Sequence, residues 1–297
     1  MKFEKLRDEF IVYLRDIRNY SPCTLDAYKR CLKFFFSYTG SLSPSLLKIE
    51  HVWEYRSYMM KKKYHPNTIH YHLIGIRAFL KFCKIKGIKI LDFERVDVGR
   101  RVREQVEYLT PDEIERLLCA VEVNSVKDLR DKAMIELLCS SGMRISEMLR
   151  LNRQDVNEDN LTKRYFPIIG KGRKRRLAFI NLRTADALRR YLAFRLDKEE
   201  PLFINHFYRS EPGESRRRLG RDGFKLVLRY YAKKAGITEK IVTAHTLRHS
   251  FATTLLKKGT DLYTIKELLG HTFITSTQIY LHVENKDLQR AHDKAFN

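Results

Sequence analysis

An arginine and a glutamate stand directly after the end of a predicted apolar helix. The helix over 127–141 stops at Gly142, Arg144 follows two residues later, and Glu147 comes three residues after that. A guanidinium is planar and permanently charged, so it can hold two oxygens of a phosphate or carboxylate at once. Arg144 taken alone is equally well explained as a solvated side chain that pairs with Glu147.

A second group of candidates lies on the helix predicted over 245–258. His245, Arg248 and His249 are separated by three and four residues, so they share one helix face. Two imidazoles and a guanidinium therefore converge there. The alternative interpretation is an exposed basic cluster without a chemical role.

Lys171 occupies the tip of a predicted β-hairpin. The segment 165–180 consists of two β-rich runs around Gly-Lys-Gly, which is a hairpin signal. A long, flexible cation at such a tip can reach a backbone phosphate or a leaving oxygen. An ordinary charged turn would look the same in sequence.

His271 and Tyr280 come near the end of the chain. His271 directly follows Gly270, which stops the helix predicted over 261–269, and Tyr280 lies on the next predicted helix, 273–282. A phenol is a possible nucleophile when nearby cations or a base remove its proton. A single helical tyrosine is otherwise half-buried packing.

The elements that must position these side chains are mostly helices. Residues 1–87 form an all-helical domain by periodicity and caps, such as Ser21-Pro22 before one helix. Residues 88–107 are charged and aperiodic, which predicts a solvated linker. Residues 108–297 form an α+β domain, which opens at the capping box of Thr110 and ends in a tail over 284–297. The expected fold is mainly α with a small β-sheet. Further helices are predicted at 111–122, 184–196 and 222–235, with a short one in the tail at 286–294.

Net charge points to a polyanionic partner. The chain has 58 Lys plus Arg against 36 Asp plus Glu, a net charge of +22. Residues 1–105 hold 22 basic and 11 acidic side chains and residues 106–297 hold 36 and 25, so each part carries +11. Both parts therefore have reason to face phosphate, as in a two-part clamp. Predicted DNA contacts are the basic residues opposite the apolar stripes and around the hairpin tip: Lys29, Lys33, Arg77, Lys81, Lys84, Arg173, Lys174, Arg175 and Arg176.

Other classes of protein are not favoured. No apolar run approaches the roughly 18 residues of a membrane span, so no membrane association and a cytoplasmic location are expected. The five cysteines are scattered, which predicts reduced core residues rather than disulfides or a zinc site. No metal or other cofactor is expected, because there is no compact Asp/Glu constellation for paired Mg²⁺. His65, His70 and His72 are not interpreted as metal ligands.

Taken together, the four motifs are more specific than any one of them. They are Gly142-x-Arg144-x-x-Glu147, Gly170-Lys171-Gly172, His245-x-Leu247-Arg248-His249, and Leu269-Gly270-His271 with Tyr280. In this order the chain resembles the tyrosine recombinases, or phage-type integrases, and among them most the Xer site-specific recombinases. The resemblance covers the whole chain and implies a SAM-like core-binding domain before the catalytic domain.

The resemblance also implies a role for each residue. Tyr280 would attack a DNA phosphate and form a 3′-phosphotyrosyl ester, and Arg144 and Arg248 would clamp the non-bridging oxygens. Lys171 would protonate the leaving 5′ oxygen. His245 and His271 would support proton movement, and Glu147 would orient an arginine. The implied assembly is a homo- or hetero-tetramer on two duplexes, each with a specific recombination site, and the tail docks on a neighbouring protomer or on its own domain.

Two other functions share parts of this pattern. A type IB topoisomerase uses the same residue types on one duplex, but the small helical domain and the short tail favour a recombinase. A catalytically silent DNA-binding regulator would not need all six residues of the set. The sequence does not separate resolution of chromosome or plasmid dimers from integration and excision of a mobile element.

Overall fold

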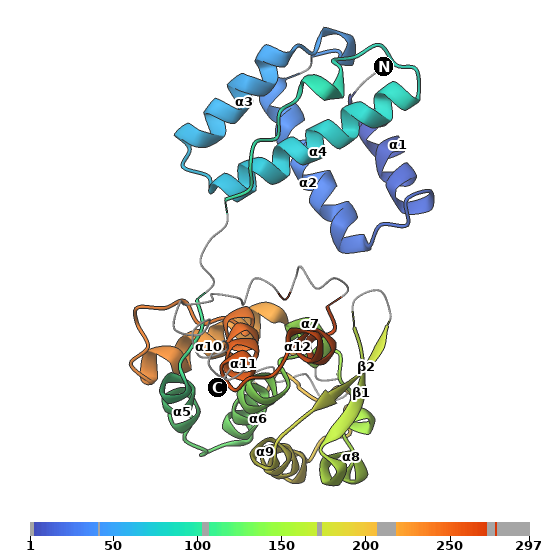
Figure 1. The fold of residues 1–297 in the computed structure, drawn as a ribbon. Helices are drawn as coiled ribbons and strands as arrows, with labels where there is room; N and C mark the ends of the chain where they lie inside the picture. The colour runs from blue at the N-terminus through green and yellow to red at the C-terminus, as the bar shows by residue number, and fades with distance from the viewer. Residues whose placement is uncertain are drawn as a thin grey trace, which may run out of the picture. The chain divides into compact units, whose positions relative to one another are not determined.

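The computed structural model describes residues 3–40, 42–102, 107–170, 174–206 and 218–271, and Thr277. It divides into two compact units, Met1–Glu104 and Gln105–Asn297, each with its own hydrophobic core. Figure 1 shows a helical first unit and a second unit in which a two-stranded hairpin lies at the side of a group of helices. The prediction of a mainly α fold with a small β-sheet is confirmed.

The first unit is built from long helices, one of which starts at the predicted cap of Ser21 and Pro22. Ser21 caps one of them, since its hydroxyl accepts a hydrogen bond from the Thr24 backbone N–H and Pro22 takes the first helical position. Its elements are α1 (Phe3–Asp16), α2 (Pro22–Thr39), the 3₁₀ turn η1 (Pro44–Leu46), α3 (Ile49–Lys61), α4 (Pro66–Ile85) and the 3₁₀ turn η2 (Phe93–Arg95).

Aromatic side chains fill the core of this unit. Phe10 of α1 packs edge to face on Phe79 of α4, with 5.7 Å between ring centroids, and Phe35 of α2 packs edge to face on Tyr55 of α3. All four rings are fully buried. Burial of such large apolar surfaces is what holds α4 against the other three helices.

The segment predicted as a solvated linker is largely part of the first unit. Leu91 and Val96 are 8% and 1% exposed and belong to its core. The side chain of Asn67, at the start of α4, exchanges two hydrogen bonds with the backbone of Val102, 3.1 and 3.2 Å long. The linker prediction failed over 88–102 because apolar residues scattered among the charges were sufficient to fold the segment back along α4; Ile88, Ile90, Phe93 and Val98 also pack against this core.

The second unit starts with the predicted capping box. Thr110 and Glu113 each accept a hydrogen bond from the other's backbone N–H. The sequence did not predict the short helices α7 and α8. The elements of this unit are α5 (Pro111–Cys119), α6 (Val126–Ser141), α7 (Ile145–Met148), η3 (Arg153–Asp155), α8 (Glu158–Lys163), β1 (Tyr165–Ile169), β2 (Arg175–Phe179), α9 (Leu182–Ala193), α10 (Arg221–Lys234), α11 (Ala244–Lys257) and α12 (Leu262–Leu269). The helix predicted over 273–282 and the tail lie outside the described residues, except for Thr277.

Helix α6 is the centre of this unit. It contacts α5, α9 and α11, and most of its residues are buried on every side. Two charged residues in it, Arg130 and Asp131, are buried as a pair, and Arg130 also donates to the Ile204 carbonyl at 2.8 Å. Buried charges are tolerated when they are paired in this way. The end of α6 is therefore held rigidly, and the first predicted site motif begins there.

Strands β1 and β2 form the predicted antiparallel hairpin. Tyr165 pairs with Phe179 at its open end and Ile169 pairs with Arg175 near the turn. Burial alternates, so residue 176 lies on the same side of β2 as the buried Ala178. The hairpin thus turns one of its basic residues toward the interior.

Two further properties concern the chain as a whole. The described helices include none that is long and apolar enough to cross a membrane. The prediction that cysteines are core residues is right for Cys31 and Cys83 and wrong for Cys23 and Cys119, which are exposed.

Candidate active site

Gly142 turns the chain at the end of α6. Its φ of +58° lies in the left-handed region, and its N–H donates to the Leu138 carbonyl at 3.1 Å. A Cβ at this position would lie 2.3 Å from Cδ1 of Phe251 on α11, which is too close for any side chain. The glycine is therefore needed for conformation and for space, and it brings Arg144 up to α11.

Arg144 and Glu147 hold each other at the start of α7. The carboxylate of Glu147 accepts from the Arg144 backbone N–H at 2.8 Å and from its Nη1 at 2.9 Å. The Glu147 side chain is 2% exposed, whereas that of Arg144 is 28% exposed. Burial of Glu147 opposes its charge, but Arg176 and the hydrogen bonds from Arg144 outweigh it and lower the pKa of the carboxyl. Glu147 is thus a buried anion that leaves one side of Arg144 open to solvent.

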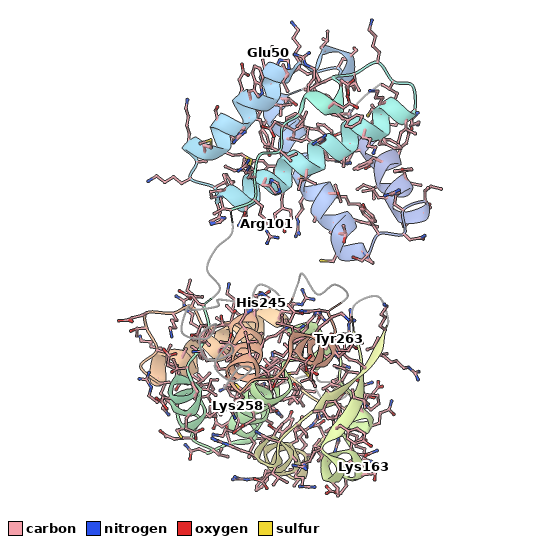
Figure 2. All side chains as sticks on the ribbon, viewed as in Figure 1. Glu50, Arg101, Lys163, His245, Lys258 and Tyr263 are labelled. Atoms are coloured by element: carbon pink, nitrogen blue, oxygen red, sulfur yellow. The ribbon has the colours of Figure 1, made fainter. Side chains whose placement is uncertain are left out.

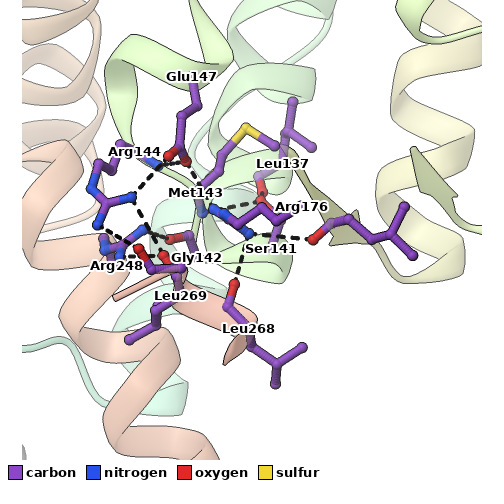
Figure 3. Close-up of polar contacts among 12 residues, drawn as sticks. Leu137, Ser141, Gly142, Met143, Arg144, Glu147, Arg176, Arg248, Leu268 and Leu269 are labelled. Carbon is purple, nitrogen blue, oxygen red and sulfur yellow. Dashed lines mark hydrogen bonds and ion pairs between the residues drawn. The ribbon is translucent and has the colours of Figure 1, made fainter. Parts of the chain in front are cut away.

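Arg248 lies against Arg144, as Figure 3 shows. It is 3% exposed and donates to the Gly142 carbonyl at 2.6 Å and to the Leu269 carbonyl at 2.7 Å. Arg144 donates to the same Leu269 carbonyl at 3.5 Å and to the Gly270 carbonyl at 3.1 Å. These carbonyls end α12, where a helix carries partial negative charge. The end of α12 therefore brings two guanidiniums together.

The predicted histidines lie next to the arginines. His245, at the start of α11, is exposed at the edge of the unit in Figure 2, and its ring packs edge to face on that of buried His249, 4.1 Å between centroids. Partial burial and the guanidiniums of Arg248 and Arg144 lower the pKa of His245. Burial and the same arginines lower the pKa of His271 to about 4. Both rings therefore carry no charge near pH 7.

His271 has a fixed orientation. Its Nδ1 lies 2.9 Å from Oγ1 of Thr277, whose side chain is fully buried. His271 follows Gly270, the left-handed C-cap of α12 with φ +63°. The glycine stop seen in the sequence thus delivers the histidine to the arginine cluster.

Two residues of the predicted set are outside the described residues, namely Lys171 and Tyr280. The base of the hairpin turn is described. Gly170 donates to the Lys174 carbonyl at 2.8 Å, and a Cβ built on Gly170 would lie 3.4 Å from Oε1 of Glu147. The residue before Lys171 is therefore adjacent to the Arg144 and Glu147 pair.

Arg176 is a site residue that sequence reasoning misassigned. We predicted it as a DNA contact, but its side chain is only 11% exposed and donates to Oε2 of Glu147 at 2.8 Å and to the Leu268 carbonyl at 2.7 Å. The signal that identifies it is the strand alternation, which places position 176 on the inner face with Ala178. In a run of basic residues around a turn, the buried arginine and the exposed ones look alike, because they differ only in which face of the strand they occupy.

The remaining predicted DNA contacts fall into two groups. Lys29, Lys33, Lys174 and Arg175 are exposed, and Arg173 lies outside the described residues. Arg77, Lys81 and Lys84 of α4 gather over the ring of Phe93 in η2, 6.0, 5.7 and 5.2 Å from its centroid. In this second group the cations are held on the surface by an aromatic ring.

The histidines of the first unit have structural partners. Nδ1 of His65 accepts from the Asn67 backbone N–H, and Nδ1 of His70 lies 2.9 Å from the Val98 carbonyl. Nδ1 of His72 lies 2.6 Å from the Tyr55 hydroxyl. Among the residues described, no group of three or more His, Cys, Asp or Glu is placed to hold a metal ion.

Comparisons with known proteins agree with this site. The family model described as the phage integrase family matches residues 107–287, and that of the phage integrase N-terminal SAM-like domain matches residues 6–90. Tyrosine recombinase XerD of Listeria innocua is 32% identical over 285 residues, covering 94% of each chain. Tyrosine recombinase XerC of Roseiflexus castenholzii is 33% identical, covering 96% of this chain and 91% of the relative.

Solved structures show the same fold. The XerH site-specific recombinase bound to its palindromic difH substrate has a TM-score of 0.73 at 22% identity, covering 97% of this chain and 84% of that one. The Tn1549 transposon integrase in complex with transposon right end DNA has a TM-score of 0.77 at 17% identity, covering 98% and 99%. The chain belongs to the phage integrase family and is a tyrosine-type site-specific recombinase. Both the family and the function predicted from sequence are confirmed.

Proposed function

We propose that this recombinase cleaves DNA with Tyr280 and holds the phosphate with Arg144 and Arg248. The hydroxyl oxygen of Tyr280 attacks phosphorus, a 3′-phosphotyrosyl bond forms, and the bond from phosphorus to the 5′ oxygen breaks. Lys171 gives a proton to that 5′ oxygen, and a neutral His245 or His271 takes the proton of the phenol. Attack by a 5′ hydroxyl from another strand reverses these steps and releases the enzyme.

One observation carries the proposal, namely that both guanidiniums bind the Leu269 carbonyl. Two fixed cations side by side stabilise the charge that builds up on phosphate oxygens during attack. Bidentate guanidiniums hold such oxygens better than ammonium groups, which is why arginine suits both positions. A phosphotyrosyl ester is similar in energy to the bond it replaces, so exchange needs no external energy source or cofactor.

The proposed substrate is two DNA duplexes that each carry a specific recombination site, with a homo- or hetero-tetramer assembled on them. The XerH relative is bound to a difH substrate, and a lambda integrase with this fold forms a dimer on its core site. Exchange of the tail 284–297 between protomers would link neighbouring active sites in such an assembly. A DNA substrate places the enzyme in the cytoplasm.

The test begins by identifying the DNA site. DNA that the tagged protein traps covalently in its host is sequenced, and a nicked duplex containing that sequence is synthesised. On denaturing gels the wild type should form a protein–DNA adduct, and Tyr280→Phe should form none while binding the duplex with unchanged affinity. Tyr263→Phe is the matched control, because this tyrosine of α12 is 63% exposed, and it should form the adduct normally. An adduct with Tyr280→Phe would remove Tyr280 as nucleophile.

A second experiment tests the lysine. With a 5′-phosphorothiolate at the cleaved bond, the leaving sulfur needs no proton, so the defect of Lys171→Ala should be much smaller than on normal DNA. The defect of Arg144→Ala should persist on both substrates, because an arginine on the phosphate is needed in each case. Equal defects of Lys171→Ala on both substrates would contradict the role of general acid.

A further inference from the structure

Arg176 joins three elements of the site with a single side chain. It comes from β2, pairs with Glu147 of α7 through Nη2, and donates to the Leu268 carbonyl of α12 through Nη1. Figure 3 shows Arg144 and Arg176 reaching Glu147 from different sides. Neither the proposed attack on phosphorus nor the proton transfers use Arg176.

The carboxylate of Glu147 is divided between the two arginines. Oε1 accepts from the Arg144 guanidinium, and Oε2 accepts from the Arg144 backbone and from Arg176. One buried negative charge is thus shared by two positive charges, which leaves the trio with a net charge of +1. Without Arg176 the pair of Glu147 and Arg144 would be neutral, and Arg144 would face the carboxylate without the opposing positive charge of Arg176.

The backbone at Gly270 is adapted to Arg176. A Cβ built on Gly270 would lie 2.6 Å from Cδ and 2.8 Å from Nε of Arg176, so no larger residue fits while the arginine is in place. Gly270 also accepts from Arg144 through its carbonyl and precedes His271. Arg176 therefore lies against the same backbone that positions a proposed phosphate ligand and a proposed proton acceptor.

We propose that Arg176 is a positioning residue for strand cleavage, which offsets the negative charge of Glu147 so that Arg144 keeps its position and its positive charge stays available to the phosphate. This inference rests on the proposed role of Arg144. Arg176 itself does not contact DNA, because it is buried against Glu147 and α12. Its loss should slow the chemical step and leave DNA affinity almost unchanged.

The test measures single-turnover cleavage at saturating protein, with DNA affinity measured separately. Arg176→Met keeps most of the side-chain volume and should lower the cleavage rate constant by about 10-fold or more, since small displacements of a catalytic group are costly. Its affinity for DNA should stay within about 3-fold of wild type, as expected for a buried residue that makes no phosphate contact. Arg176→Lys keeps the charge but loses the fork that spans Glu147 and Leu268, so it should recover only part of the rate.

The decisive variant is the double substitution Arg176→Met with Glu147→Gln. It removes the negative charge that Arg176 neutralises, so it should cleave faster than Arg176→Met alone. A purely structural role predicts the opposite, because a second buried substitution would add to the damage.

Arg195→Met is the matched control for folding. Arg195 is likewise buried, pairs with Asp197 and donates to the Pro201 carbonyl at 2.7 Å, and it contacts none of the site residues above. This variant should lose thermal stability without a change in the rate constant of the folded protein. If Arg176→Met behaves as Arg195→Met does, or the double variant is slower than the single one, the inference is wrong. Failure of the wild type itself to form an adduct would instead overturn the proposed function.

Discussion

Glu147 binds Arg144 at two points, its backbone N–H and its guanidinium. The carboxylate thereby caps α7 and orients the side chain that we place on the phosphate. A residue whose sequence pattern suggested only a supporting acid is in fact the centre of the arginine cluster. Its contribution to stability and its contribution to catalysis should be measurable separately.

Glu147→Ala should reduce the free energy of unfolding of the catalytic unit by about 3–5 kcal/mol, because it leaves the mostly buried Arg176 and the partly buried Arg144 without their anion. Urea denaturation monitored by circular dichroism measures this. Glu158→Ala is the control, since Glu158 forms an exposed pair with Arg189 and its loss should change the free energy of unfolding far less than that of Glu147. Equal losses in the two variants would show that burial of the Glu147 cluster contributes nothing.

Arg144 and Arg248 should differ in what their removal does. The Arg144 side chain is partly exposed, whereas Arg248 is buried and ties α11 to the Gly142 and Leu269 carbonyls. Both alanine variants should slow cleavage by about 10²-fold or more, because each removes a preorganised cation. Arg248→Ala should also lower the melting temperature by several degrees, and by more than Arg144→Ala does. A stable Arg248→Ala protein would mean that its backbone hydrogen bonds are energetically unimportant.

Gly142→Ala should destabilise the catalytic unit more than an ordinary glycine substitution. A left-handed φ costs a non-glycine residue about 1–2 kcal/mol, and the clash of the new methyl with Phe251 adds to it. Gly142→Ala combined with Phe251→Leu should regain the part of the stability that the clash removes, but not the part that the backbone strain removes. Gly259→Ala, with φ +84° and nothing within 4 Å of a Cβ, measures the strain alone. If the Gly142 and Gly259 variants lose equal stability, Phe251 does not constrain the turn.

The sequence was sufficient for the longer helices and the hairpin, and it named Arg144, His245, Arg248 and His271, which the structure brings together. Gly142 and Gly270 were correctly predicted as helix stops, because a glycine after an apolar stripe is a local signal. The same signals placed Arg144 and His271, and helical spacing placed Arg248 beside His245. Sequence patterns predict a side chain's position correctly when the turn or helix that positions it is formed by its own neighbours in the chain.

Two contributions were not local and were therefore missed. The role of Arg176 depends on Glu147 and Leu268, which come from other elements, and nothing in a run of basic residues shows that one of them is buried. The fold of 88–102 depends on Leu91 and Val96 finding the core formed by α4. Both depend on contacts between residues that are far apart in the sequence, and the periodicity of apolar residues does not predict such contacts.

The histidines of the site should make stability fall with acid. Burial and the neighbouring histidines and Arg248 lower the pKa of His249 to about 3, and the pKa of His271 is about 4. Unfolded histidine titrates near 6.5, so between about pH 6.5 and 4 the unfolded chain binds protons that the folded chain does not. Stability is then fully present above this window and is lost as the pH falls, by up to about 1.4 kcal/mol per pH unit for each such histidine.

Carboxylates also titrate at the lower end of this window, so the informative quantity is the difference between wild type and His249→Gln in urea denaturation across pH 4 to 7.5. The variant lacks one of these protonation sites and should show a shallower dependence, whatever its stability at pH 7.5. Parallel curves for the two proteins would show that His249 keeps an ordinary pKa in the fold and that the packing around His245 does not exclude its charged form.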